Sequence, residues 1–164
     1  DTVLGPEMKS TGEIIGKDVN LPKALYKGFI ASGVNVPDYG TALMTVSDKD
    51  KAEIIPLAKR LISLGYHIVA TTGTGKALEA EGIKVDVIEK INENSNDILD
   101  AIRDGRINLV VNTMTEGKTS ETDGFLIRRE AVENNIPCLT SLDTAEALLQ
   151  AMETIHFQLE DMSK

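Results

Sequence analysis

From residue 41 onward, short apolar runs alternate with segments of helical periodicity, and this alternation constrains the fold more than any other feature of the sequence. Five runs have the length and composition of strands, at residues 41–46, 66–70, 83–88, 107–111 and 136–139. Each connection between them is long enough to hold the crossover helix that parallel strands require. The sequence therefore predicts an α/β fold, with an open, mostly parallel five-stranded sheet flanked by helices in a Rossmann-like three-layer arrangement.

Five helices are predicted in and after these connections. The first follows Ser47-Asp-Lys-Asp50, a capping box of the serine-plus-acid type, and ends at Gly65. Pro56 must lie in the first turns of this helix or kink it. The other helices are expected at residues 76–81, 97–104, 125–134 and 141–162.

The first forty residues have a different character. Residues 1–20 are interrupted by glycine and proline and have no sustained period, so they have the character of the end of a preceding domain. Residues 21–31 are expected to form a short helix, and a linker rich in glycine and proline leads to a domain boundary near residue 40. The later domain then spans residues 41–164.

Composition excludes several classes of function. No run of 18 apolar residues and no signal-peptide pattern is present, so we expect neither a membrane span nor secretion. The single cysteine, Cys138, has apolar neighbours and is expected in the core of a strand, which fits a reducing, cytoplasmic setting without disulfides or a metal cluster. A net charge of −9 and the absence of tryptophan argue against nucleic-acid binding.

The stretch from Val69 to Leu78 has the form of a strand, a tight loop and a helix N-terminus. We expect Thr71, Thr72 and Thr74, with the backbone amides of Gly73 and Gly75, to offer donors to a phosphate at the positive end of the helix dipole. The alternative is an ordinary turn in which Thr74 only caps the helix. The phosphate reading requires these hydroxyls and amides to be open to a ligand.

Ligands of open α/β sheets lie beyond the carboxyl ends of the strands. Polar residues gather there in five segments, 47–51, 71–76, 90–95, 112–118 and 140–141. Lys51 is placed to reach the same anion, while Lys90 and Asn112 are placed to meet the sugar or base of a nucleotide. A lone lysine is more often a solvated surface charge, so the argument depends on several of them converging.

Catalytic groups are scarce among these segments. His67 lies within a strand and His156 within the last helix, so both are expected to be structural. Asp97 and Asp123 are the plausible carboxylates, although Asp97 suits the start of a helix. The predicted site is therefore better suited to binding than to proton transfer.

Several segments together resemble the methylglyoxal-synthase-like domain, and in particular the C-terminal regulatory domain of the carbamoyl phosphate synthetase large chain. They are the Ala-Thr-x-Gly-Thr loop at residues 70–74, the stretch from Asn96 to Thr113, and Ile127-Arg-Arg-Glu-Ala131. Residues 4–16 resemble the closing segment of the ATP-grasp unit that precedes this domain. The resemblance covers nearly the whole chain.

The resemblance implies an allosteric domain that binds a nucleotide effector such as UMP, with IMP or phosphoribosyl pyrophosphate in related forms. The family's binding positions fall on Lys51, Thr71, Thr74, Lys90 and Asn112, and we extend the expected site to Thr72, Gly73, Gly75 and Thr113, with Lys76, Lys118, Arg128 and Thr140 as further candidates. Met114 departs from the family's threonine. Leu139 replaces an aspartate beside the ornithine-contacting position that Thr140 matches.

The resemblance also implies the setting of the domain. The expected partners are the rest of the synthetase large chain and its small glutaminase chain, in the cytoplasm, with a homo-oligomer contact through this domain as a further option. The parent enzyme would use ATP with Mg or Mn in pyrimidine or arginine biosynthesis, whereas this domain needs no cofactor.

Two other interpretations of the function remain open beside the regulatory domain. Methylglyoxal synthase itself requires a catalytic aspartate and a histidine at positions where this sequence has Ser95 and Ser120. The third reading is an assembly domain that binds no ligand.

Overall fold

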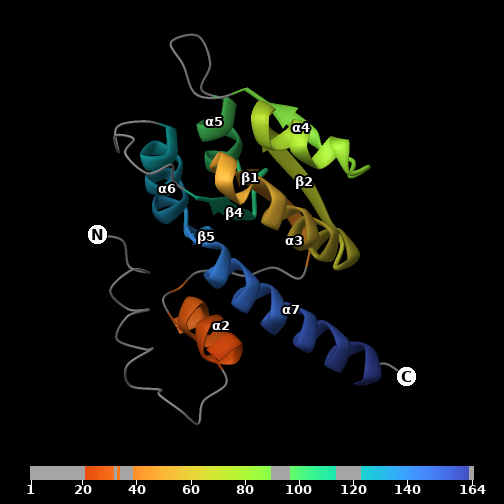
Figure 1. Ribbon diagram of the computed structural model, residues 1–164. Helices are drawn as coiled ribbons and strands as arrows, with labels where there is room; N and C mark the ends of the chain where they lie inside the picture. The colour runs from red at the N-terminus through yellow and green to blue at the C-terminus, as the bar shows by residue number, and fades with distance from the viewer. Residues whose placement is uncertain (1–20, 32, 34–38, 90–96, 114–122, 163–164) are drawn as a thin grey trace.

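Five parallel strands form one sheet, in the order β3-β2-β1-β4-β5. The computed structural model describes residues 21–31, 33, 39–89, 97–113 and 123–162 (Figure 1). The strands are β1 (Gly40–Thr45), β2 (Tyr66–Thr71), β3 (Asp86–Ile88), β4 (Leu109–Asn112) and β5 (Cys138–Leu139). The predicted fold class is confirmed, and the sheet is parallel throughout.

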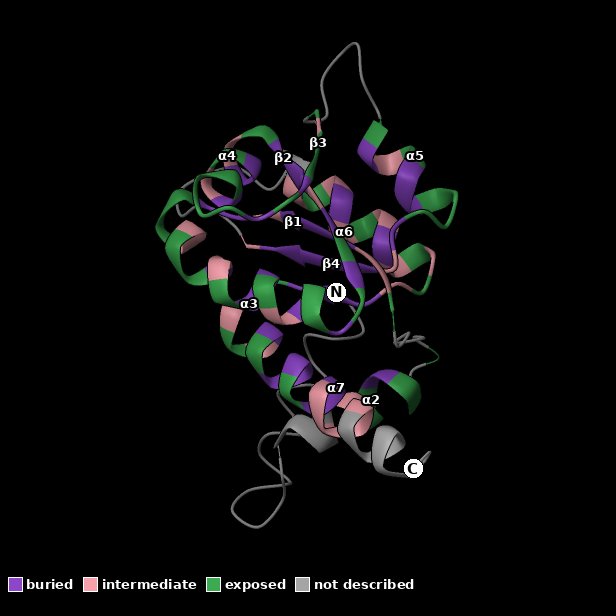
Figure 2. Cartoon of the chain, turned by 90° about the vertical axis from the view of Figure 1, so that its right-hand side faces the viewer, coloured by how far each residue is buried: buried purple, intermediate pink, exposed green. Residues whose placement is uncertain are grey.

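Helices cover both faces of the sheet. One apolar cluster joins Met44 of β1 to α3 (Lys51–Ser63), α4 (Thr72–Ala80) and α7 (Leu142–Met162). A second cluster joins the neighbouring Leu43 to α5 (Asp97–Arg103) and α6 (Asp123–Glu133) on the other face. Because successive strand residues point to opposite faces, the central strands are buried on both sides, as the colours of Figure 2 show.

The helix α2 (Leu21–Ala31) packs alongside α7 (Figure 1). Its Phe29 is 1% exposed and belongs to the same apolar cluster as Met44. The proposed tail at residues 1–20 lies outside the described residues, and the boundary near residue 40 stays a prediction. Within the described chain, α2 packs against the domain that follows it.

An arginine ties α3 to α7. The guanidinium of Arg60 donates to both oxygens of Glu146, at 2.7 and 2.6 Å, and to Glu153 at 2.6 and 3.0 Å. The bonds to Glu153 come from Nε and Nη2 and match the fork geometry of arginine, whereas both bonds to Glu146 come from Nη1. They fix the position of α3, the helix that begins with Lys51.

Several predicted boundaries are wrong in instructive ways. The helix α4 begins at Thr72, not at residue 76, so Gly73 and Gly75 lie in its first turn and not in a loop. Residues 83–85 precede β3 without joining it, and Asn112 is the last residue of β4. The predicted capping box is also wrong: the Ser47 hydroxyl donates to the Asp50 carboxylate at 2.8 Å and caps no backbone amide.

The chain enters α3 through a short 3-10 turn, η1 (Asp48–Asp50). Pro56, expected in the first turns of this helix or at a kink, lies inside α3 and is exposed.

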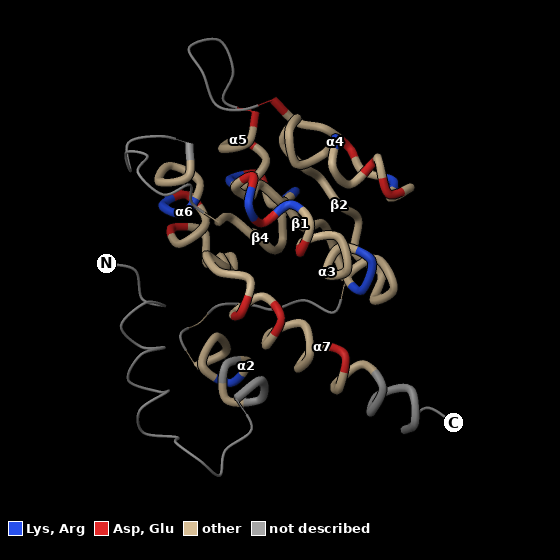
Figure 3. Tube along the Cα trace, in the orientation of Figure 1, with Lys and Arg blue, Asp and Glu red and all other residues tan. Residues whose placement is uncertain are grey.

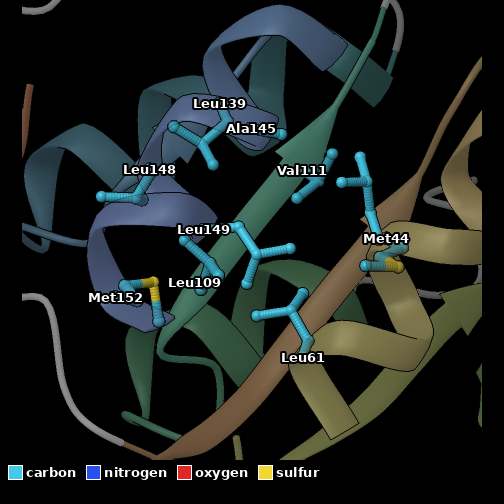
Figure 4. Close-up of a pocket in the computed structure, with 10 residues that line it drawn as sticks. Met44, Leu61, Leu109, Val111, Leu139, Ala145, Leu148, Leu149 and Met152 are labelled. Atoms are coloured by element: carbon cyan, nitrogen blue, oxygen red, sulfur yellow. The ribbon is translucent and has the colours of Figure 1, made fainter. Parts of the chain in front are cut away.

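The core between the sheet and α7 contains only a small gap. Figure 4 shows the side chains around it, which are all apolar and include Met44, Leu109 and Met152. Its volume is about 10 Å³, which is near the space that a single water molecule needs. A nucleotide-sized ligand therefore has no place in this part of the core.

Candidate anion-binding site

The carboxyl ends of the central strands form a row of polar residues. Thr45 at the end of β1 is in register with Asn112 of β4. On its other side, the hydroxyl of Thr71 in β2 donates to the Thr45 hydroxyl oxygen at 3.1 Å. Because β1 lies between β2 and β4, this row crosses the point where the strand order reverses, which is where ligands of such sheets bind.

The loop from β1 to α3 is held from both sides by threonine hydroxyls. The Val46 amide donates to Thr74 Oγ1 at 3.1 Å, and the Ser47 amide donates to Thr113 Oγ1 at 2.9 Å. Val46 and Ser47 are 8% and 5% exposed, so unpaired amides here would be costly. The two threonines therefore fix the loop that leads into α3 and Lys51.

The N-terminus of α4 presents some, but not all, of its predicted ligand groups. Thr71 is the N-cap residue, yet its side chain makes no capping bond to the helix. Thr72 is exposed and Gly73 is half-buried, whereas Thr71 and Thr74 are only 2% and 1% exposed. Of the residues predicted to bind phosphate, Thr72 and Gly73 are therefore accessible to a ligand. The hydroxyls of Thr71 and Thr74 instead make hydrogen bonds inside the protein.

The glycines of α4 have different surroundings. A Cβ built on Gly75 would lie 3.0 Å from a methyl carbon of Val87, so Gly75 allows α4 to pack against β3. A Cβ built on Gly73 would lie 2.9 Å from Nζ of Lys51. The structure therefore places the Lys51 ammonium against the first turn of α4, as the sequence predicts.

Lys51 is the first residue of α3 and its side chain is 25% exposed. Its ammonium also forms an ion pair with Asp48 of η1, whose side chain is 94% exposed. Acidic and basic residues alternate through η1 into the start of α3 (Figure 3). The charge of Lys51 therefore meets both a helix N-terminus and a carboxylate.

The remaining predicted residues fall in different places. Asn112 is 3% exposed, and a Cβ built on Gly124 would lie 3.4 Å from its Oδ1, so β4 approaches the first turn of α6 closely. Lys76 is exposed on α4, one turn beyond Thr72. Lys90 and Lys118 lie outside the described residues, as do Ser95 and Ser120.

A second hollow of about 470 Å³ lies at the carboxyl ends of β4 and β5. It brings together three of the predicted residues, Thr113, Arg128 and Thr140. Lys49, Asp50 and Ser141, which the sequence places at this edge of the sheet within segments 47–51 and 140–141, also line it, together with residues that the sequence did not predict there, Glu53, Leu142 and Asp143. The start of α7 faces η1 because of the order of the strands in the sheet. A local sequence motif therefore does not predict this hollow.

The groups of a nucleophilic or metal site are not assembled in the described chain. Cys138 is buried in the second core cluster, as predicted, and burial raises the pKa of its thiol to about 12. His67 lies near the amino end of β2, away from the polar row, and pairs with Asp86 at 2.7 Å. Across residues 21–31, 33, 39–89, 97–113 and 123–162, no group of three or more histidine, cysteine or acidic residues is arranged to hold a metal ion.

The same residues contain no helix that is both long and apolar enough to cross a bilayer.

A comparison with protein families identifies the class of protein. Residues 53–140, which are more than half of the chain, match the family described as MGS-like domain. The chain belongs to the MGS-like domain family. The match includes the residues of the α4 N-terminus, the end of β4 and Thr140.

Two solved structures have a similar fold. One is methylglyoxal synthase from Elizabethkingia anophelis NUHP1, with a TM-score of 0.58 and 19% sequence identity over 70% of this chain and 79% of that one. The other is ForH, with a TM-score of 0.55 and 23% identity over 71% of this chain and 80% of that one. At these identities the likeness concerns the fold.

Proposed function

We propose that this chain is the allosteric regulatory domain of a carbamoyl phosphate synthetase large chain, and that it binds a phosphorylated effector at the N-terminus of α4. The observation that carries the proposal is the position of Lys51, whose Nζ would lie 2.9 Å from a Cβ on Gly73. Membership of the MGS-like domain family and the sequence resemblance to the synthetase supply the wider setting.

The groups around Gly73 suit a phosphate. The first-turn amides of α4 point along the positive end of the helix dipole, the Thr72 hydroxyl is exposed, and the Lys51 ammonium carries a full charge. Charge-assisted hydrogen bonds of this kind are about twice as strong as neutral ones. Lys51, Thr72 and Gly73 are therefore assigned to the phosphate.

The other candidates are assigned by their positions. Thr71 holds the row of strand ends and Thr74 holds the β1–α3 loop, while Asn112 ends the row at β4 and Thr113 follows it. We assign these last two to the nucleoside part of UMP or IMP, or to the ribose of phosphoribosyl pyrophosphate, and we add Lys90 from the sequence resemblance alone, because it lies outside the described residues. Arg128 and Thr140 line the hollow near β5, which Thr113 also borders, and are not assigned to the phosphate.

A regulatory role is preferred to a catalytic one because of the residues at two positions. The sequence has Ser95 and Ser120 where methylglyoxal synthase requires an aspartate and a histidine, and serine is a poor general base without an activating partner. In this proposal the parent enzyme is an ATP-dependent ligase of the cytoplasm, assembled with its glutaminase chain. The domain senses a metabolite of pyrimidine or arginine biosynthesis.

Titration calorimetry of this chain with UMP, IMP and phosphoribosyl pyrophosphate tests the proposal. We expect heat with at least one of them, and a loss of roughly ten- to a hundredfold in affinity in Lys51→Met, because a charge-assisted hydrogen bond contributes ~1.5–3 kcal/mol. Lys59→Met, an exposed lysine in the same helix, is the matched control and should bind normally.

Two results would count against this assignment. No heat with any of the three ligands favours an assembly domain without a ligand. Formation of methylglyoxal from dihydroxyacetone phosphate would support the enzyme reading.

A further inference from the structure

The side chain of Asn112 is buried but has no hydrogen-bond partner. Asn112 is the last residue of β4 and is only 3% exposed. Among the residues that the structure describes, none forms a hydrogen bond with its amide oxygen or nitrogen. Every polar side-chain atom of the described chain that is sealed from solvent does have a partner, so the small exposed surface of Asn112 must include its amide. Buried polar side chains are nearly always paired, and this amide is therefore a group that a ligand can satisfy.

The first turn of α6 leaves room in front of this amide. A Cβ built on Gly124 would lie 3.4 Å from Oδ1 and 3.8 Å from Nδ2 of Asn112. Gly124 is not one of the glycines with a positive φ, so its backbone conformation does not require glycine. The missing side chain instead keeps the amide uncovered on the side that faces α6.

Asn112 lies two strands away from the phosphate position proposed above. The strand β2 leads into α4, and only β1 separates β2 from β4. Neighbouring strands are about 4.8 Å apart, which places Asn112 roughly 10 Å from the end of β2. In a nucleotide the ribose separates the phosphate from the far edge of the base by a comparable length.

We propose that the Asn112 amide hydrogen-bonds the edge of a nucleobase, so that this site selects nucleotides over sugar phosphates that lack a base. The inference rests on the proposed function and deepens it by naming the class of effector. The amide offers a donor beside an acceptor, and the edge of a base complements this arrangement. A phosphate could use only the donor, and its charge would be repelled by the amide oxygen.

Calorimetry with UMP, IMP and ribose 5-phosphate tests this inference on the wild type and on Asn112→Leu. The ligands share a ribose and a phosphate, and leucine has nearly the shape of asparagine without its hydrogen-bonding groups. We expect the wild type to bind at least one nucleotide roughly tenfold or more tightly than ribose 5-phosphate, as paired contacts between an amide and a base allow. Asn112→Leu should lose roughly this factor for the nucleotide and less than about twofold for ribose 5-phosphate.

The variant Gly124→Ala repeats the test without changing the amide. Its Cβ would rest against Oδ1 of Asn112, so the nucleotide should bind more weakly while ribose 5-phosphate is unaffected. Alanine is favoured over glycine within a helix, so this variant should fold even if Asn112→Leu does not. Gly28→Ala is the matched control, because its Cβ meets nothing within 4 Å, and it should bind both kinds of ligand normally.

The outcomes distinguish this inference from the function on which it rests. If both variants weaken the nucleotide and ribose 5-phosphate equally, or if the wild type binds ribose 5-phosphate as tightly as either nucleotide, the base contact is overturned and the effector site stands. If the wild type binds none of the three ligands, the effector site and the base contact are overturned together.

Discussion

The substitution Gly73→Ala should separate ligand binding from stability. Its new Cβ would lie 2.9 Å from Nζ and 3.7 Å from Cε of Lys51, so the flexible end of the lysine has to move. Reaching a carbon contact of about 3.5–4.0 Å requires a shift of roughly 0.6–1.1 Å in Nζ. A displacement of this size is enough to break a hydrogen bond to a ligand that sits on the α4 amides.

Gly73→Ala should weaken ligand binding but leave the stability of the protein equal or slightly higher. Loss of the charge-assisted bond from Lys51 should weaken UMP binding roughly ten- to a hundredfold. The same change replaces glycine by alanine within a helix, which stabilises a helix interior by about 0.5–1 kcal/mol and a first turn by less. The variant should therefore be at least as stable as the wild type and yet bind poorly.

Calorimetry with UMP and urea unfolding measure the two effects. Gly28→Ala in α2 is the matched control, because its Cβ meets nothing within 4 Å and the helix lies away from the polar row. It should gain about 0.5–1 kcal/mol of stability, at least as much as Gly73→Ala, with no change in affinity. If Gly73→Ala binds UMP as tightly as the wild type does, the ammonium does not contact the ligand and the site has been placed wrongly.

Three further predictions concern single contacts. Thr74→Val should lower the free energy of unfolding by ~1–3 kcal/mol in urea titrations, since it leaves the buried Val46 amide without its acceptor; an unchanged midpoint would contradict this. Gly40→Ala should be strongly destabilising in the same assay, because φ is +150° and the new Cβ would lie 2.8 Å from Cγ of Asn108. The Cys138 thiol ionises at about 12 when folded and near 8.5 when unfolded, so its contribution to stability is complete below pH 8.5 and is lost as the pH rises toward 12; Cys138→Ala should flatten this fall, and an equal slope would exclude the thiol.

The sequence predicts the elements of this fold better than their arrangement. Apolar runs such as 107–111 identify the central strands because these are buried on both faces, whereas the edge strand β3 is largely exposed and only the second half of the run 83–88 forms it. The order β3-β2-β1-β4-β5 depends on which strands pair, and no local pattern encodes it. The early start of α4 was missed because glycines at residues 73 and 75 suggest a loop, whereas a helix accepts them in its first turn when close packing requires it.

In the candidate site, too, some contacts could be predicted from the sequence and others could not. The proximity of Lys51 to the α4 N-terminus was predictable, since both follow adjacent strands at the same edge of the sheet. The inward contacts of Thr71 and Thr74 were not, because each depends on a partner from β1 or from the loop after it.

The threonine contacts on either side of the β1–α3 loop decide how tightly a ligand is enclosed. The Val46 and Ser47 amides already donate to Thr74 and Thr113, so neither of them is available to a phosphate. A phosphate at the N-terminus of α4 would therefore receive no main-chain hydrogen bond from these two residues. We therefore expect rapid exchange on the NMR timescale, a property suited to following a fluctuating metabolite pool.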